Sequence, residues 1–185
     1  MMHANLFLIS VILSPLSSSS NERVLFDFAQ ANAKSWRSVN DGVMGGRSSG
    51  NSRINKDKNL EFSGILSLEN NGGFSSIRTT GNSLGMSKSD TIVLRVKGDG
   101  RKYNLNLYAK ANLGGYSFRQ SFQTKKDDWI EVKLPVDQFQ ATWRGRRYPS
   151  VQLNPQQVQG MGILLGDKKP GRFKLELDWV KVVGE

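Results

Sequence analysis

The sequence predicts an all-β protein, a jelly-roll β-sandwich formed by one domain over residues 23–181. Short segments alternate apolar and polar residues with a period of two, which places one strand face on a core and the other in water. Turns rich in Gly, Asn and Asp separate these segments. No window of 12 residues has helical periodicity. About nine or ten strands joined by long loops suit two packed sheets.

Four segments alternate clearly, and five more are weaker candidates. The clear strands are 91–97, 103–108, 129–134 and 173–180; the weaker ones are 24–28, 60–68, 74–79, 116–123 and 161–165. In the last clear strand, we expect the side chains of Phe173, Leu175, Leu177 and Trp179 to share the buried face. The other large aromatic residues Trp36, Phe74 and Trp129 are also expected in the core.

Turn chemistry supports this division of the chain. Gly98-Asp99-Gly100 lies between two clear strands, and Asp-Gly suits the positive φ angles of a tight hairpin. Asn154-Pro155 is typical of the start of a helical turn, with Asn as cap and Pro as first residue. We expect that single turn to end near Gly160.

The charge balance favours acidic partners. Lys and Arg number 26 against 16 Asp and Glu, so the net charge is +10. The basic residues form only short groups, at Lys125-Lys126, at Arg144, Arg146 and Arg147, and at Lys168-Lys169. Nucleic-acid binders more often carry a long basic stripe with interleaved aromatic residues, so a nucleic-acid partner is not favoured.

The composition excludes several kinds of catalysis. There is no Cys, and the one His, His3, precedes the expected domain. Ser-His-Asp and Cys-His mechanisms and sites built from His or Cys metal ligands are therefore excluded. Asp41 and Glu69 could form a glycosidase pair, but a turn aspartate and a solvated glutamate are the favoured interpretation. We expect no enzyme activity, no cofactor and no metal; calcium held by Asp and Asn oxygens stays open.

Residues 1–20 have the pattern of a secretory signal. Leu6–Leu13 is an apolar run interrupted only by Ser10, and the small residues Ser18–Ser20 suit cleavage. A run this short does not span a bilayer, which needs about 20 residues, so no transmembrane span is expected. No Lys or Arg precedes Leu6, and the alternative is a disordered tail or a misassigned start. Export, to the periplasm for example, follows from the first interpretation, and a cytoplasmic or organellar location from the second.

Three loop segments carry specific motifs. Residues 36–48 contain Asn-Asp-Gly-Val-Met-Gly-Gly, residues 62–78 contain Asn-Asn-Gly-Gly-Phe, and residues 96–103 read Val-Lys-Gly-Asp-Gly-Arg-Lys-Tyr. Together they resemble the complex I intermediate-associated protein family, assembly factors of mitochondrial NADH:ubiquinone oxidoreductase. The similarity extends through 129–135, 139–146, 161–163 and 173–179, and so covers nearly all of 24–180. It implies a galactose-binding-domain-like jelly roll and a chaperone-like role without catalysis. The short N-terminal region, which has no Arg-rich transit peptide, departs from the mitochondrial members.

Two groups of residues are candidates for binding a partner or ligand. The first group is Asn40, Asp41, Asn70 and Asn71, in the two motif loops, although these residue types also form good turns. The second group is Trp143, Arg144, Arg146, Arg147 and Tyr148, in a segment without strand alternation. Trp, Tyr and Arg are enriched at binding hot spots, so this segment is predicted to be a loop that contacts a partner, and an acidic protein surface or an acidic sugar would suit its arginines. The alternative function is an exported carbohydrate-binding module, for which both groups could supply sugar ligands.

Overall fold

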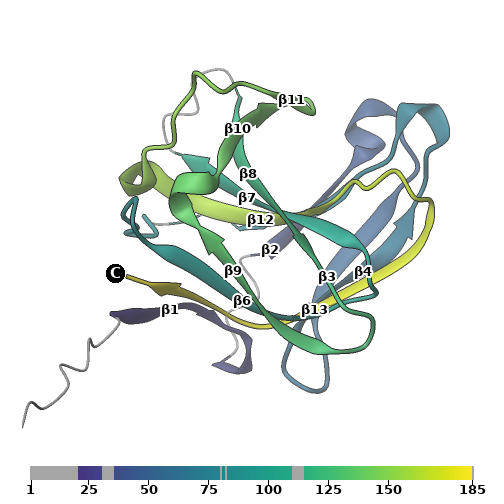
Figure 1. Ribbon diagram of the computed structural model, residues 1–185. Coiled ribbons are helices and arrows are strands. Elements are labelled where there is room, and N and C mark those ends of the chain that lie inside the picture. Colours follow the sequence, from purple (N-terminus) through teal and green to yellow (C-terminus); the bar gives the residue numbers. More distant parts are fainter. Residues whose placement is uncertain (1–20, 31–35, 80, 82, 110–114, 185) are drawn as a thin grey trace, which may run out of the picture.

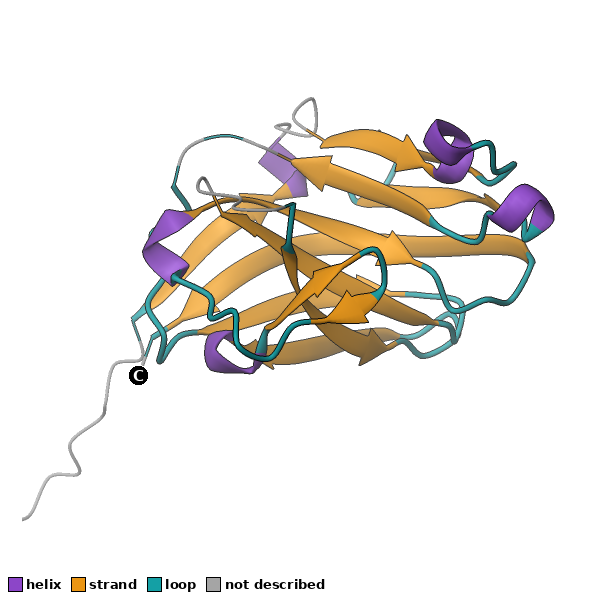
Figure 2. Ribbon diagram, turned by 90° about the horizontal axis from the view of Figure 1, so that it is seen from above, coloured by secondary structure: helices purple, strands orange, loops and turns teal. Residues whose placement is uncertain are grey.

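The computed structural model describes residues 21–30, 36–79, 81, 83–109 and 115–184 (Figure 1). The expected signal segment 1–20 lies outside the described residues. The described chain forms two antiparallel sheets that pack face to face, with short 3-10 turns in the connections (Figure 2). This confirms the predicted all-β sandwich.

The first sheet has six strands in the order β3-β4-β13-β6-β9, and β1 also pairs with β13. Its strands are β1 (Glu22–Asp27), β3 (Ser49–Ile54), β4 (Leu60–Leu66), β6 (Thr91–Lys97), β9 (Trp129–Pro135) and β13 (Gly171–Val183). The long strand β13 pairs with β4 along its first half and with β1 along its second half. The chain termini of the sandwich therefore lie side by side in this sheet.

The second sheet has seven strands in the order β11-β10-β8-β7-β12-β5-β2. Its strands are β2 (Trp36–Asn40), β5 (Ser75–Thr79), β7 (Lys102–Ala109), β8 (Ser117–Gln123), β10 (Gln140–Trp143), β11 (Arg146–Arg147) and β12 (Val158–Leu165). The 3-10 turns are η1 (Phe28–Gln30), η3 (Asp41–Met44), η4 (Glu69–Asn71), η5 (Val136–Gln138) and η6 (Pro155–Gln157).

The core fills the space between the two sheets. Phe62 and Phe173 from the first sheet pack edge to face at 4.9 Å, and Tyr103 stacks on Phe122 at 6.2 Å in the second. Trp36 is buried in the same core, as predicted, and packs edge to face on Phe28 at 6.0 Å. Burying an apolar side chain of this size stabilises the fold by about 1.5–3 kcal/mol each, so these inward faces hold the two sheets together.

All nine predicted strands are present, and four strands were missed. The missed strands are β2, β3, β10 and β11. They lie at or next to the edges of the sheets, where polar residues can occupy both faces, so their sequences do not alternate.

The predicted hairpin at Gly98-Asp99-Gly100 is wrong in topology. A turn is present, and Gly100 has a φ of 82°. It joins β6 of the first sheet to β7 of the second, so the two flanking strands do not pair with each other. The turn residues fix the local backbone, but they do not determine whether the chain folds back in the same sheet or crosses to the other.

The predicted burial of Trp179 is also wrong, because β13 contains a bulge. The pairing with β6 shifts between Leu177 and Trp179, which leaves Asp178 as an extra residue. An extra residue reverses the alternation of faces beyond it. Val180 and Val182 therefore enter the core, while Trp179 lies half-buried on the outer face with the Lys181 ammonium 4.3 Å from its ring centroid.

The predicted core positions of Trp129 and Phe74 are wrong as well. Trp129 is half-buried on the outer face, where Arg95 and Lys97 lie over its ring, and Phe74 is half-buried in its loop. The cap at Asn154 is confirmed, since its side chain accepts a hydrogen bond from the Gln156 N–H at 3.2 Å. The turn ends at Gln157, earlier than expected, because β12 begins at the next residue.

Candidate functional site

Asp41 is the centre of the first motif loop and has no exposed surface. Its Oδ1 accepts a hydrogen bond from the Ser48 N–H at 2.9 Å, and its Oδ2 accepts from the Ser48 hydroxyl at 2.6 Å. The N–H groups of Gly73 and Phe74 donate to Oδ2 at 2.6 and 3.2 Å. Burial by itself would raise the pKa of the Asp41 carboxyl, but these hydrogen bonds outweigh it and lower the pKa below its ordinary value. The carboxylate thus joins the loop after β2 to the loop before β5.

The neighbouring asparagines support the same two loops. Asn40 donates to the Gly50 carbonyl at 3.1 Å and accepts from the Ser75 hydroxyl at 2.6 Å. Asn70 donates to the Gly45 carbonyl at 3.2 Å. Asn70 and Asn71 have φ angles of 53° and 58°, which asparagine tolerates. Their side chains are exposed, so they remain candidates for contact with a partner.

The carboxylate pair considered for glycoside hydrolysis does not face a common space that a substrate could enter. Asp41 is fully buried, whereas Glu69 is exposed and forms an ion pair with Arg47 at 3.0 Å. A general acid or nucleophile must reach the sugar that it acts on. In this structure the Asp41 carboxylate cannot do so.

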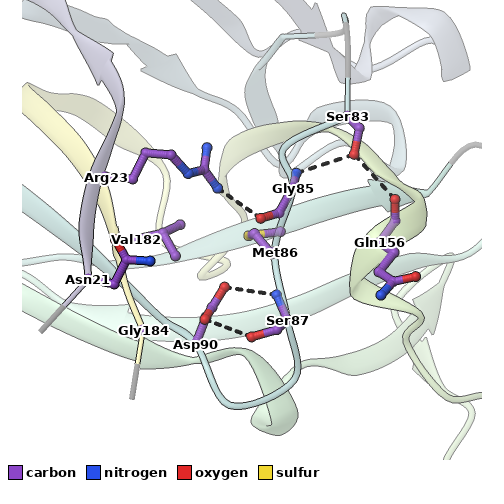
Figure 3. Close-up of a pocket in the computed structure, with 10 residues that line it drawn as sticks. All are labelled: Asn21, Arg23, Ser83, Gly85, Met86, Ser87, Asp90, Gln156, Val182 and Gly184. Carbon is purple, nitrogen blue, oxygen red and sulfur yellow. Dashed lines mark hydrogen bonds between the residues drawn. The ribbon is translucent and has the colours of Figure 1, made fainter.

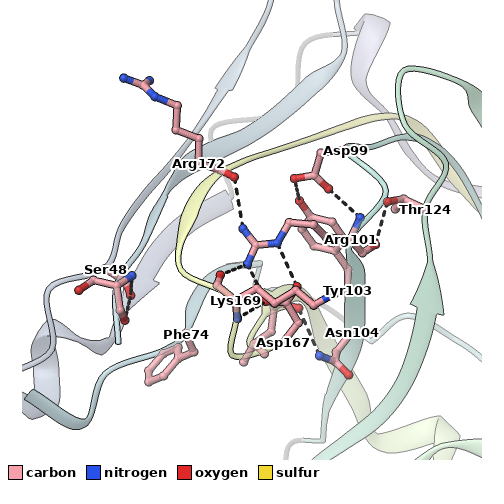
Figure 4. Close-up of polar contacts among 12 residues, drawn as sticks. Ser48, Phe74, Asp99, Arg101, Tyr103, Asn104, Thr124, Asp167, Lys169 and Arg172 are labelled. Carbon is pink, nitrogen blue, oxygen red and sulfur yellow. Dashed lines mark hydrogen bonds and ion pairs between the residues drawn. The ribbon is translucent and has the colours of Figure 1, made fainter. Parts of the chain in front are cut away.

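The third motif forms a second anchor around Arg101 (Figure 4). Arg101 Nε and Nη2 donate to the two carboxylate oxygens of Asp167 at 3.0 and 2.6 Å, a forked ion pair. The guanidinium also donates to the backbone carbonyls of Lys169 and Arg172. The hydrogen bond to Asp167 raises the pKa of the Arg101 guanidinium. Burial by itself would raise the pKa of the Asp167 carboxyl, but its hydrogen bonds with Arg101 outweigh burial and lower that pKa. This pair ties the β6–β7 crossover to the β12–β13 connection.

The predicted contact loop at 143–148 is a β-hairpin, which corrects the expectation of an irregular loop. β10 and β11 pair with Trp143 opposite Arg146, and Arg144 and Gly145 form the turn with φ angles of 46° and 80°. Trp143 is 39% exposed, with the Arg144 guanidinium 4.9 Å from its ring centroid. Tyr148 packs edge to face on Tyr116 at 4.9 Å and is half-buried.

The two predicted groups lie at opposite edges of the seven-stranded sheet. Asn40 ends β2 at one edge, and Arg146 and Arg147 form β11 at the other. The structure therefore does not bring the two groups together. The outer face of the seven-stranded sheet lies between the two groups.

A row of directly paired residues crosses that outer face. Arg37 on β2 pairs with Arg78 on β5, which pairs with Gly162 on β12. The row continues through Asn106 on β7 to Arg119 on β8 and Gln140 on β10. Residues paired in this way share one face of a sheet. We call this set, Arg37, Arg78, Gly162, Asn106, Arg119 and Gln140, the arginine row.

Side-chain contacts hold the middle of the arginine row in place. Arg119 Nε donates to Asn106 Oδ1 at 2.8 Å, and Asn106 Nδ2 donates to the Tyr108 hydroxyl at 3.4 Å. The Arg78 guanidinium lies 5.2 Å from the centroid of the Tyr108 ring. Asn106 is 1% exposed although it points outward from the sheet. The two guanidinium groups are therefore fixed on either side of a buried amide.

Charge is divided unequally between the two sheets. The strands of the seven-stranded sheet, every residue of which is described, contain no Asp or Glu. Their cationic residues are Arg37, Arg78, Lys102, Arg119, Arg146 and Arg147. On the six-stranded sheet, by contrast, the strands contain acids and several cations are paired with them: Glu61 and Glu176 both contact Lys174, and Asp178 contacts Arg95.

One hollow lies beside the arginine row. Its volume is about 210 Å³, and Arg119, Gln140 and Arg147 contribute to its wall. Its other lining residues are Lys102, Gln120, Ser121, Gln138 and Thr142. Arg147 is thus the one residue of the predicted second group that reaches this part of the face.

A larger hollow, of about 470 Å³, lies near the chain ends of the sandwich (Figure 3). Its charged groups are occupied within the protein. Arg23 donates to the carbonyls of Leu84 and Gly85 at 2.7 and 2.9 Å, and Asp90 accepts from the N–H and hydroxyl of Ser87. These internal bonds make it a weaker candidate than the face with the arginine row.

Metal and membrane features are limited within the part of the chain that the structure describes. That part contains no group of three or more His, Cys, Asp or Glu side chains placed to hold a metal ion. None of its helical segments is long and apolar enough to cross a membrane.

Comparison with known sequences gives a consistent family match. The model of the family described as complex I intermediate-associated protein 30 (CIA30) matches residues 26–177. A Caenorhabditis briggsae protein named probable complex I intermediate-associated protein 30, mitochondrial, is 31% identical over 99 residues, or 51% of this chain and 29% of that protein. The Mus musculus protein of that family name is 32% identical over 102 residues, or 52% and 31%. The matches thus span less than a third of the length of these relatives.

Comparison with solved structures supports the fold. A family 11 carbohydrate-binding module from Clostridium thermocellum, in complex with a β-1,3-1,4-mixed-linked tetrasaccharide, has a TM-score of 0.68. It is 19% identical, and the match covers 90% of this chain and 98% of the module. The agarase AgWH50C gives a TM-score of 0.62 at 7% identity, over 89% of this chain and 24% of the enzyme. At these identities the likeness shows the fold alone, and it confirms the galactose-binding-domain-like sandwich.

Proposed function

Because the chain belongs to the complex I intermediate-associated protein 30 family, we propose that it is a non-catalytic binding domain that assists assembly of a protein complex related to respiratory complex I. The family match over residues 26–177 and the similarity of the motif loops support this role. Since the chain corresponds to less than a third of its curated relatives, the proposal concerns this domain and not the whole activity of those proteins.

The observation that carries the proposal is the outer face of the seven-stranded sheet. It presents several ordered cations whose strands contain no acid, so their charge is not balanced on the same sheet. A set of like charges held in fixed positions costs folding free energy. Such a cost is expected where the charges bind a partner, because residues at binding sites often reduce the stability of the fold.

Loss of the gene in the organism that encodes the chain tests the assembly role. We expect the amount of assembled complex I, measured on native gels by NADH dehydrogenase staining, to fall, and re-expression of the full chain to restore it. Unchanged complex I in the deletion strain would contradict the role. We expect the purified chain to show no enzymatic turnover; measurable turnover would indicate a catalytic function instead.

Carbohydrate binding is the second candidate, because the fold matches sugar-binding modules over nine-tenths of the chain. Affinity electrophoresis in gels that contain mixed-linked β-glucan tests it. Retardation of the chain by this neutral polymer, together with normal complex I in the deletion strain, would favour this candidate over the assembly role.

A further inference from the structure

The arginine row holds like charges at the closest spacing that a sheet allows. Arg37 and Arg78 are directly opposite each other on β2 and β5. Like charges in this arrangement are destabilising. Among the described residues, no carboxylate forms an ion pair with Arg37, Arg78, Arg119 or Arg147, whereas several cations on the six-stranded sheet, such as Arg53, Arg95, Lys97 and Lys174, do have such partners.

In the arginine row, the Arg78 side chain lies across the neighbouring strand β12. A Cβ atom at Gly162 would come within 2.6 Å of the Ile77 carbonyl oxygen, 3.1 Å of Arg78 Cγ and 3.2 Å of the Tyr108 hydroxyl. The absence of a side chain at Gly162 thus allows the close approach of β5 and also leaves room for Arg78 to extend over β12 towards Tyr108. Arg78 Nε is buried and has no hydrogen-bond partner within the described structure. A buried donor without a partner is costly, so the position of Arg78 is one that the fold alone does not favour.

Arg119 is positioned from the other side. Only its Nε is engaged by Asn106 among the described residues, which leaves both Nη groups to donate elsewhere. Burial lowers the pKa of the Arg119 guanidinium; the nearby Tyr108 opposes this shift, and the charge of Arg78 adds a smaller lowering. The two arginines thus repel each other across Asn106, and an anion placed between them would relieve that repulsion.

We propose that the arginine row binds an extended acidic segment of a partner polypeptide, through carboxylates that pair with Arg78 and Arg119. This inference rests on the proposed role of the chain in protein assembly. Forked guanidinium–carboxylate pairs are strong and directional, and they suit Asp and Glu side chains.

The spacing of the row suits a polypeptide. Arg78 and Arg119 are three strands apart in the order β5-β12-β7-β8, but both side chains extend to β7, where Arg78 lies over the Tyr108 ring and Arg119 binds Asn106. Their guanidinium groups are therefore closer together than their backbones. Alternate residues of an extended chain share one face and lie about 7 Å apart, so two acidic residues at positions i and i+2 suit this pair. A neutral sugar usually stacks on an exposed aromatic ring, whereas Tyr108, the aromatic residue beside the row, is half-buried under Arg78.

The test measures fluorescence anisotropy of a labelled dodecapeptide of alternating Glu and Thr, titrated with the full chain. We expect binding that weakens as salt rises, and no binding of the matched Gln-Thr peptide. Arg78→Gln with Arg119→Gln should weaken binding at least about tenfold. Arg78→Lys with Arg119→Lys should weaken it by less, because charge is kept and the fork is lost.

The matched control is Lys56→Gln with Lys133→Gln, which removes the same charge from exposed positions of the six-stranded sheet and its β3–β4 turn. It should change affinity by less than about twofold. Removal of Arg78 and Arg119 relieves repulsion but also takes the Arg119 donor from the buried Asn106, so these effects oppose each other and the melting temperature of each variant is measured beside its affinity. If the variant without Arg78 and Arg119 unfolds, chemical-shift changes in wild-type protein upon peptide addition decide the matter: they should map to β5, β7, β8 and β12.

Four results would overturn the inference. They are equal affinity of the glutamine and control variants, shifts that map to the six-stranded sheet, no peptide binding at low salt, and tighter binding of polygalacturonate or an oligonucleotide than of the peptide. If any of these results is found and the deletion strain also loses complex I, the assembly role is supported and only the binding of an acidic segment is contradicted. If the deletion strain has normal complex I and the chain still binds the peptide, the assembly role is contradicted instead.

Discussion

Asp41 Oδ2 accepts a hydrogen bond from the Gly73 N–H at 2.6 Å, although 32 residues separate the two along the chain. The carboxylate is fully buried and also binds Ser48 and the Phe74 N–H. Two motifs that the sequence places far apart are therefore one structural unit. This arrangement gives the first two predictions.

Replacement of Asp41 by Ala should destabilise the protein by about 3 kcal/mol or more, because three backbone N–H groups lose their acceptor in a buried position. Glu69→Ala is the control: its ion pair with Arg47 is exposed and should contribute less than about 1 kcal/mol. Urea denaturation measures both. Equal losses in the two variants would show that the buried carboxylate is not the anchor of these loops.

The same hydrogen bonds predict how Asp41 responds to pH. Its pKa in the folded protein lies below the ordinary value of 3.8, because the hydrogen bonds from Ser48, Gly73 and Phe74 together outweigh burial. Its contribution to stability is therefore complete above about pH 4 and is lost as pH falls through the folded pKa. The carboxyl ¹³C shift of Asp41 should titrate below 3.8, and stability should fall more steeply from pH 4 to pH 2 in wild type than in Asp41→Asn. Titration above 3.8 would contradict the prediction.

Gly100 in the β6–β7 crossover should be sensitive to substitution. Its φ is 82°, and a Cβ there would meet the nearest atom only at 3.7 Å, so strain and not crowding is the cost. Gly100→Ala should destabilise by about 1 kcal/mol. Gly42→Ala is the matched control, since its Cβ would lie in open space and its φ is not positive. Thermal melts should separate the two variants; similar melting temperatures would mean that the crossover tolerates another backbone conformation.

The hairpin arginines should differ in their effect on binding. Replacing Arg144, Arg146 and Arg147 together by Ser should leave the fold intact, because all three side chains are exposed. Binding of the Glu-Thr peptide should weaken, and Arg147→Ser alone should account for most of the change, since Arg147 lines the hollow beside the arginine row. Anisotropy titrations of the single, double and triple variants measure this. An equal effect of the Arg144 and Arg146 double variant would place the contact at the hairpin tip.

Local patterns predicted the strands but not their partners. The strand at 91–97 has the expected bounds, because its alternation is uninterrupted and turns flank it. Sheet membership depends on which distant segments pack together, so the turn at Gly98–Gly100 could not reveal a crossover. Nor could the alternation in 173–180 reveal the bulge at Asp178, since Trp179 continues the apolar phase of Leu175 and Leu177, and the apolar residues Val180 and Val182 begin the other phase only beyond it.

The candidate face illustrates the same limit. Because Leu105 and Leu107 alternate with Asn104 and Asn106, the sequence of this strand predicts that both asparagines lie on its outer side, and the structure places them there. Arg37, Arg78 and Arg119 were not identified, because each is a single cation in a strand of its own. They become neighbours only through pairings of β2, β5, β12, β7 and β8. The signal in the sequence was the lack of acids in certain strands, and it is visible only once those strands are known to form one sheet.

The unequal charge of the two sheets also affects events before any contact forms. A molecule with balanced charge on one face and unbalanced positive charge on the other is turned by the field of an anionic partner, so that the seven-stranded sheet leads its approach. Such steering raises the rate of productive collisions and fades as salt shortens the screening length, which is about 8 Å under physiological conditions. The distribution of charge over the two sheets would therefore orient the protein as it approaches its partner, in addition to stabilising the bound state.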